Sequence, residues 1–129
     1  MATDGLIDRF WQEHRLSQGT RQERLEASGA AWGEVDDLLD GPASEVVRML
    51  VALAEAAPSE EGVGLVGAGP IEELVARRAG QFDSEEGREL LEELDTAARR
   101  SARFRSALAF AFFGDEVPKG VREQLERFR

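Results

Sequence analysis

The sequence has no cysteine and no tyrosine, a single histidine, His14, and a single lysine, Lys119. Without cysteine the chain forms no disulfide, has no thiolate nucleophile and holds no cysteine-ligated metal. Its longest uncharged stretch, residues 62–71, is far shorter than the roughly 18 apolar residues of a membrane-spanning helix. The first five residues lack the basic start and apolar core of a signal peptide. We therefore expect a cytoplasmic protein with no membrane contact.

Positive charge is also scarce. The chain has 16 basic against 26 acidic residues and a formal net charge of −10 at pH 7. Such a surface repels phosphate groups, so we expect no binding to nucleic acid. The same charge suits a basic protein partner, although an acidic surface also simply keeps a protein in solution. Charge alone leaves both interpretations open.

Apolar residues recur at helical spacing along the whole chain, and no segment alternates apolar and polar residues as a strand would. The first such segment, about residues 4–14, places Leu6, Ile7, Phe10 and Trp11 on one face. The length of 129 residues fits one domain. We predict an all-α fold, a single domain over residues 1–129 with seven to eight short helices. Helical hairpins stacked like part of a solenoid are one arrangement that the pattern allows.

Four prolines, Pro42, Pro58, Pro70 and Pro118, each precede an apolar-periodic segment. A proline in the first helical turn costs nothing, because its missing N–H would have no intrahelical acceptor there. We therefore predict four helix starts and no helix interrupted by proline. At Gly67, Gly69 and Pro70 we predict a tight turn, in which Gly67 ends one helix in the left-handed conformation and Pro70 begins the next.

Capping patterns predict where further helices begin. Thr20 and Glu23 have the spacing of a capping box. The helix that follows would place five residues on one face: Leu25, Ser28, Trp32, Val35 and Leu39. Gly29 and Gly33 weaken this helix, and they indicate either a kink or the close approach of a neighbour.

In the second half of the chain, Asp83 is the predicted cap of a helix through Leu90 and Leu94, and a break is predicted near Ser101. The next helix has more aromatic residues than any other segment. We expect Phe104, Leu108, Ala111 and Phe112 on one stripe, with Phe110 and Phe113 on other faces. This helix is therefore predicted to be the most buried.

Residues 62–67 have the pattern G-x-G-x-x-G. These glycines bind a pyrophosphate only where they join a buried strand to a helix. No strand is expected here, and Glu72 would occupy the space of an anion at the predicted helix start. We interpret the glycines as part of a turn between helices and expect no cofactor.

The acidic run at residues 85–95 and His14 are the candidates for a metal or acid–base site. Helical di-metal sites need Glu-x-x-His pairs, which the single histidine does not supply. We interpret the run as a solvated acidic face and His14 as an imidazole packed at an edge. No serine stands in a nucleophile elbow, so we predict no catalytic residue, although carboxylate acid–base sites leave no linear signature.

Arg99, Arg100, Arg103 and Arg105 form the only basic cluster. Arginines at the C-terminal end of a helix complement its dipole. The same cluster is the candidate contact for an anion or for an acidic partner.

Residues 66–74, with Trp32 upstream and Phe104, Arg105 and Leu108 downstream, resemble a bacterial domain family of unknown function. Its core motif is Gly-Ala-Gly-Pro-(Leu/Ile)-Glu, and the similarity covers roughly residues 32–113. The chain departs from the motif at Ser101 and Ala102, where the family has Asn-Pro, which leaves the helix cap there open. The resemblance implies a helical domain, but it implies no activity and no site residues.

Two functional hypotheses follow. The first is a non-catalytic protein-interaction module, similar in class to immunity proteins, whose acidic face binds a basic partner. The alternative is a helical domain, or a small enzyme, that binds a small molecule or an anion through the arginine cluster or through the predicted helix start at Pro70. A pocket lined by buried arginine would favour the alternative, and an exposed apolar or acidic patch would favour the first.

Overall fold

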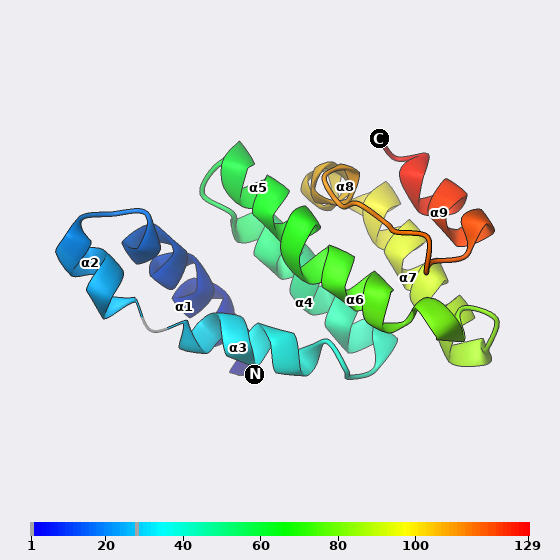
Figure 1. Cartoon of the computed structure of the whole chain (residues 1–129), viewed down its shortest axis with the longest axis horizontal. Coiled ribbons are helices and arrows are strands. Elements are labelled where there is room, and N and C mark those ends of the chain that lie inside the picture. Colours follow the sequence, from blue (N-terminus) through cyan, green and yellow to red (C-terminus); the bar gives the residue numbers. More distant parts are fainter. Residues whose placement is uncertain (1, 28) are drawn as a thin grey trace.

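The computed structural model describes residues 2–27 and 29–129, which fold into helices and connecting segments without a strand (Figure 1). The elements are α1 (Ala2–Ser17), α2 (Arg21–Glu26), α3 (Ala30–Leu38), α4 (Ala43–Ala56), α5 (Glu60–Val66), the π-helical turn η1 (Gly67–Ile71), α6 (Glu72–Arg77), the 3-10 turn η2 (Ala79–Gln81), α7 (Glu85–Arg100), α8 (Ala102–Ala109) and α9 (Lys119–Glu126). Because α5, η1 and α6 follow one another without a break, the described part of the chain has eight separate helices. The prediction of an all-α fold with seven to eight helices is confirmed.

The helices lie in pairs, and successive pairs follow one another across the molecule in chain order (Figure 1). Within the pairs, α1 contacts α3, α4 contacts α5, and α7 contacts α8. Between the pairs, α1 contacts α4, and α4 contacts both α7 and α8. The last helix, α9, packs on α7 and α8 and completes the row.

Buried apolar side chains of the described residues form one connected core, in which α4 is central. Leu50 and Leu53 of this helix are fully buried. The indole nitrogen of Trp11 donates a hydrogen bond to the carbonyl oxygen of Leu53 at 3.0 Å. Because the last carbonyls of a helix have no intrahelical donor, this bond satisfies one of them and holds α1 against the end of α4.

The segment around Gly67 and Pro70 is not a turn between two helices, so that prediction was wrong. Gly67 has φ −67° and ψ −52°, which is right-handed helix, and Pro70 lies inside the helix. The amide of Glu72 donates to the carbonyl oxygen of Gly67, five residues earlier. In a regular α-helix the ring of Pro70 would clash with the carbonyl of Val66. The wider π-helical turn accommodates the proline without ending the helix.

Gly67 is a glycine because another helix passes close to it. A Cβ atom at this position would overlap the carbonyl oxygen of Ala107 in α8 and would lie 2.9 Å from its carbonyl carbon. Pro42 and Pro118 stand directly before α4 and α9, and α5 begins two residues after Pro58, as predicted. Three of the four prolines therefore precede helices.

Of the two predicted caps, the one at Thr20 is confirmed and the one at Asp83 was wrong. Thr20 and Glu23 form the capping box at the start of α2. Ser84, rather than Asp83, caps α7, because the Ser84 side chain accepts from the amide of Gly87. Ser101 caps α8 through the amide of Phe104 at 3.1 Å and also donates to the carboxylate of Glu55. The helix cap that the sequence left open at Ser101 is therefore the serine side chain.

The single helix predicted after Thr20 is divided by Gly29, whose φ of 74° is the only positive value among the described residues. The chain therefore changes direction between α2 and α3, and the predicted stripe is interrupted. Val35 and Leu39 are buried as predicted, whereas Leu25 is 73% exposed and Trp32 is 42% exposed. Ser28 lies outside the described residues.

The aromatic helix is shorter than predicted and ends at Ala109. Phe104 and Leu108 are buried in α8 as expected. The four residues after Ala109 alternate between exposed and buried side chains. Ala111 and Phe113 are buried, while Phe110 is 60% exposed and Phe112 is 70% exposed. The prediction that Phe112 shares the buried stripe was therefore wrong.

Candidate functional site

A groove with a volume of about 480 Å³ lies between α3, the helix formed by η1 and α6, and residues 112–117. We name it the α3–α6 groove. The side chains from α3, spaced by three and four residues along one helix face, are Trp32, Val35, Asp36 and Leu39. The residues from η1 and α6 are Ala68, Gly69, Pro70, Glu72, Glu73 and Ala76. The residues of the third segment are Phe112, Phe113, Gly114, Glu116 and Val117.

Trp32 is held in a defined position at the edge of this groove. Its ring stacks on that of Phe10, with centroids 5.3 Å apart and an angle of 21° between the planes. The ring also lies close above Gly69, where a Cβ atom would be 2.9 Å from the indole. Gly69 is thus required for the approach of Trp32 and not for a turn. The π-helical segment, a feature often found at functional sites, therefore forms part of the groove.

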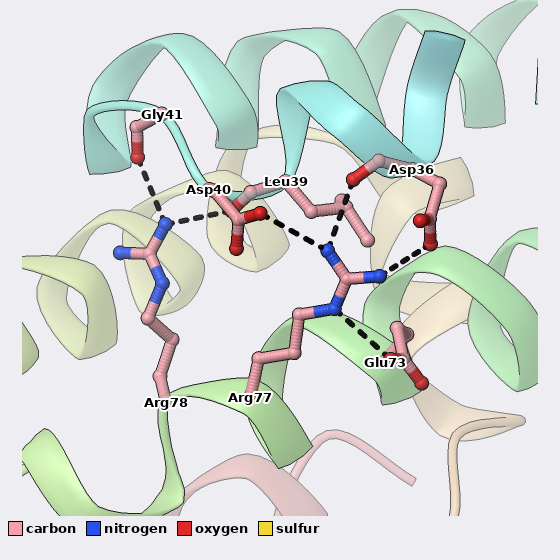
Figure 2. A network of polar contacts seen from close by, with 7 residues as sticks. All are labelled: Asp36, Leu39, Asp40, Gly41, Glu73, Arg77 and Arg78. Carbon is pink, nitrogen blue, oxygen red and sulfur yellow. Dashed lines mark hydrogen bonds and ion pairs between the residues drawn. The ribbon is translucent and has the colours of Figure 1, made fainter. Parts of the chain in front are cut away.

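Carboxylates dominate the polar lining. Asp36, Glu72, Glu73 and Glu116 line the groove, and the described residues of the lining include no basic one. Two of the four form ion pairs with Arg77 at the end of α6, whose single positive charge is also shared with Asp40 (Figure 2). The guanidinium lies 2.5 Å from Asp36 Oδ1 and 2.9 Å from Glu73 Oε1. Asp36 and Glu73 together hold the pKa of Arg77 well above its ordinary value, so this arginine remains charged.

Arg77 and Arg78 also join the two helical walls of the groove. Arg77 donates to the carbonyl oxygen of Asp36 at 3.0 Å, and Arg78 donates to those of Leu39 and Gly41 at 2.7 and 2.8 Å (Figure 2). These carbonyls lie at the C-terminal end of α3 and just beyond it, where cations are favoured, and that of Asp36 also accepts from the amide of Leu39. The two arginines thus fix α3 against α6.

Glu72 and Glu116 are the two carboxylates of the lining without an ion pair in the described part of the chain. Glu72 accepts a hydrogen bond from the amide of Phe112 at 3.1 Å, which holds residues 112–117 against α6. The prediction that Glu72 occupies an anion site at a helix start was wrong, because the helix does not begin there. No basic residue in the described part of the chain pairs with these two carboxylates, so they make the groove negatively charged.

The predicted arginine cluster does not converge on one point within the described structure. Arg99 pairs with Asp95 at 2.7 Å and lies over the Phe128 ring. Arg103 donates to the carbonyl oxygen of Ala57 at 2.9 Å, and Arg105 to that of Ala98 at 3.1 Å. Arg100 is exposed. Three of the four arginines thus make contacts within the protein. None of the four lines the α3–α6 groove. An anion site at this cluster stays a prediction.

The ion pairs of Asp95 connect α7 to α9, and we expect them to contribute to stability in a pH-dependent way. Arg99 and Arg127, the latter at 2.5 Å, lower the pKa of Asp95 below its ordinary value of 3.8. A lowered pKa in the folded state means that the contribution is complete above pH 3.8 and is lost as pH falls further. We expect Asp95→Asn to lose up to about 1 kcal/mol at pH 7, because both arginines are partly solvated.

Urea unfolding of wild type and Asp95→Asn, followed over a pH series, measures this difference. It should shrink below pH 3.8. Glu92→Gln, on an exposed part of the same helix, is the control and should change stability little at any pH. A difference for Asp95→Asn that stays constant as the pH falls would refute the ion-pair explanation.

His14 and the glycines of residues 62–67, the other candidates from the sequence, make packing contacts inside the protein. His14 is half-buried and makes an edge contact with Trp11, with ring centroids 5.5 Å apart. The glycines of residues 62–67 lie within α5 and the start of η1, and a Cβ atom at Gly62 would be 3.1 Å from the Trp11 ring. These glycines therefore do not form a phosphate-binding loop. Among the described residues, no group of three or more acidic or histidine side chains is placed to hold a metal ion.

Comparisons with models of protein families, with curated proteins and with solved structures found no match to this chain. The resemblance of residues 66–74 to a bacterial family of unknown function therefore stays a prediction. No helix among the described residues combines the length and the apolar character needed to cross a bilayer.

Proposed function

We propose that the chain is a non-catalytic protein-interaction module and that its α3–α6 groove binds a basic segment of a partner protein. The observation that supports this most is the combination of exposed aromatic rings with carboxylates that lack a counter-charge among the described residues. Trp32 and Phe112 are 42% and 70% exposed, and Glu72 and Glu116 lie in the same groove. Aromatic anchors in a pocket supply most of the binding energy of many interfaces.

The charge of the groove favours a basic partner over an acidic one. An acidic segment would meet four carboxylates and no basic residue in the described lining, which disfavours its association. The net charge of −10 adds a long-range attraction that guides a basic partner toward the protein. The volume of about 480 Å³ fits a few side chains of a peptide.

The alternative, a domain that binds an anion, has less support. The described residues of the groove lining include no cation, and three arginines of the predicted cluster are already hydrogen-bonded or ion-paired within the chain. An anion would therefore have to displace internal contacts at the cluster. In the groove it would meet like charge, which is unfavourable.

Binding to two sets of short synthetic peptides tests the proposal. The first set combines arginine, lysine and apolar residues, and in the matched set aspartate and glutamate replace the basic residues. We expect fluorescence anisotropy to detect binding of basic peptides only, with an affinity that falls as salt is added. Trp32→Ala should weaken binding about ten-fold or more, equivalent to about 1.4 kcal/mol.

Leu25→Ala is the control for this measurement, because Leu25 is exposed on α2 and does not line the groove. It should bind the basic peptides as the wild type does. Thermal melts of both variants establish that each is folded. Equal binding of the acidic set, or unchanged binding by folded Trp32→Ala, would rule out the groove as a site for basic segments.

A further inference from the structure

The Trp32 ring lines the groove and is held in place by its neighbours. Phe10 covers part of the ring by stacking, and Gly69 allows the helix to approach its edge. The residue nevertheless remains 42% exposed and lines the groove. A ring already held in place loses little conformational entropy when a ligand stacks on it. Tryptophan is also the aromatic side chain that attracts cations most strongly.

The two carboxylates of the lining that form no ion pair with a described residue, Glu72 and Glu116, come from two different segments of the groove. Glu72 follows Gly69 by three residues, at the junction of η1 and α6. Glu116 belongs to the opposite segment, and its carboxylate lies beside Gly114. Asp36 and Glu73 are occupied by Arg77, so a single additional cation would be bound mainly by Glu72 and Glu116.

Apolar groups complete the lining between the ring and the carboxylates. Val35, Leu39 and Ala76 line the groove beside Trp32 and the acidic residues. Val35 and Leu39 are almost fully buried, so the exposed apolar surface of the groove is mainly that of Trp32, Ala76 and Phe112. A long side chain with an apolar stem and a charged end, such as arginine or lysine, can place its stem on this surface while its charge reaches the acids.

This inference rests on the proposed function and specifies the occupant: we propose that the α3–α6 groove recognises an arginine side chain of the partner in preference to lysine. The guanidinium stacks on the exposed surface of Trp32 and donates hydrogen bonds to Glu72 and Glu116. Its flat faces and in-plane donors allow both contacts at once, and it is less strongly hydrated than an ammonium group. The compact ammonium of lysine cannot stack on the ring while it donates to both carboxylates.

The test uses N-acetyl-arginine amide and N-acetyl-lysine amide as probes, titrated into the ¹⁵N-labelled full chain and followed by NMR. We expect the arginine derivative to shift the indole signal of Trp32 and the amide signals of Phe112 and Glu116. The lysine derivative should cause the same shifts only at about ten-fold higher concentration, equivalent to about 1.4 kcal/mol. The indole signal of Trp11, which is buried, serves as an internal reference.

Two variants test whether Glu72 and Glu116 bind the guanidinium. Glu72→Gln and Glu116→Gln should each reduce the preference for the arginine derivative, and the glutamine oxygen at position 72 can still accept from the amide of Phe112. Glu92→Gln, on the exposed side of α7, removes the same charge away from the groove and should leave the titration unchanged.

The outcomes separate the inference from the proposed function. Equal affinity for the two derivatives, or shifts confined to residues outside the groove, would overturn the preference for arginine. If basic peptides still bound at Trp32 in that case, the proposed function would stand without it. If neither derivative shifted the groove signals and no basic peptide bound, both proposals would fail.

Discussion

Gly67→Ala is expected to destabilise the protein by about 3 kcal/mol, because the added methyl group has no space. Its Cβ atom would overlap the backbone carbonyl of Ala107 and would lie 3.1 Å from the Cβ of Phe110. A backbone carbonyl inside α8 cannot rotate away as a side chain can, so η1 and α8 would have to separate. Both Gly67 and Ala107 are buried, and the separation would open the core.

The sign of this effect is informative, because alanine stabilises an ordinary helix by about 1 kcal/mol relative to glycine. Gly33→Ala is the matched control. Gly33 lies in α3 and is exposed, and a Cβ atom there would meet nothing within 4 Å outside its own helix backbone. We expect Gly33→Ala to be neutral or stabilising by up to about 1 kcal/mol. Urea unfolding followed by circular dichroism measures both, and a stabilising Gly67→Ala would refute the close approach of the two helices.

Phe104→Ala is expected to cost about 3–5 kcal/mol of unfolding free energy, the usual range for removing a fully buried phenylalanine. Phe104 is 0% exposed in the connected core, next to the cap formed by Ser101. Removal of the ring leaves a cavity that the surrounding helices fill only in part. The expected loss is a large fraction of the total stability of a domain of this size.

Phe112→Ala is the matched control for Phe104→Ala, since it removes the same side chain from a position that is 70% exposed. We expect Phe112→Ala to cost about 1 kcal/mol or less and to weaken the binding of basic peptides. Guanidinium unfolding and peptide titration measure the two effects separately. A loss of stability as large as that of Phe104→Ala would mean that the helix continues past Ala109 and buries Phe112, as the periodicity of the sequence predicted.

The α3–α6 groove forms where helices break or widen at positions at which the apolar periodicity of the sequence predicted continuous helix or a simple turn. Gly29 separates α3 from α2, so that Trp32 is not buried in a longer helix. The π-helical turn brings Gly69 under the Trp32 ring. Because α8 ends at Ala109, Phe112 lies in a connecting segment and lines the groove. Breaks of local periodicity at functional surfaces are a known feature of proteins.

The candidate site was therefore only partly predictable. The acidic lining of the candidate groove agrees with the net charge of −10, which sequence alone provides. Trp32 and Phe112 were predicted as core residues because their spacing matches buried neighbours. A segment with four phenylalanines within ten residues, followed by Gly114 and Pro118, exceeds what one buried stripe can hold. This number of phenylalanines was the one feature of the sequence that could have indicated an exposed aromatic residue.

The sequence by itself determined the all-α class, most helix starts and the main core positions. These depend on local interactions, since a cap such as Thr20 or Ser101 acts within three residues and an amphipathic face recurs within one turn. Tertiary structure alone decided the role of Gly67 and Pro70. A glycine needed for the close approach of another helix cannot be distinguished in the sequence from a glycine that ends a helix. Only the position of Ala107 shows that Gly67 is of the first kind. The groove likewise joins three segments that are distant in the chain, so its chemistry exists only after the helices have packed.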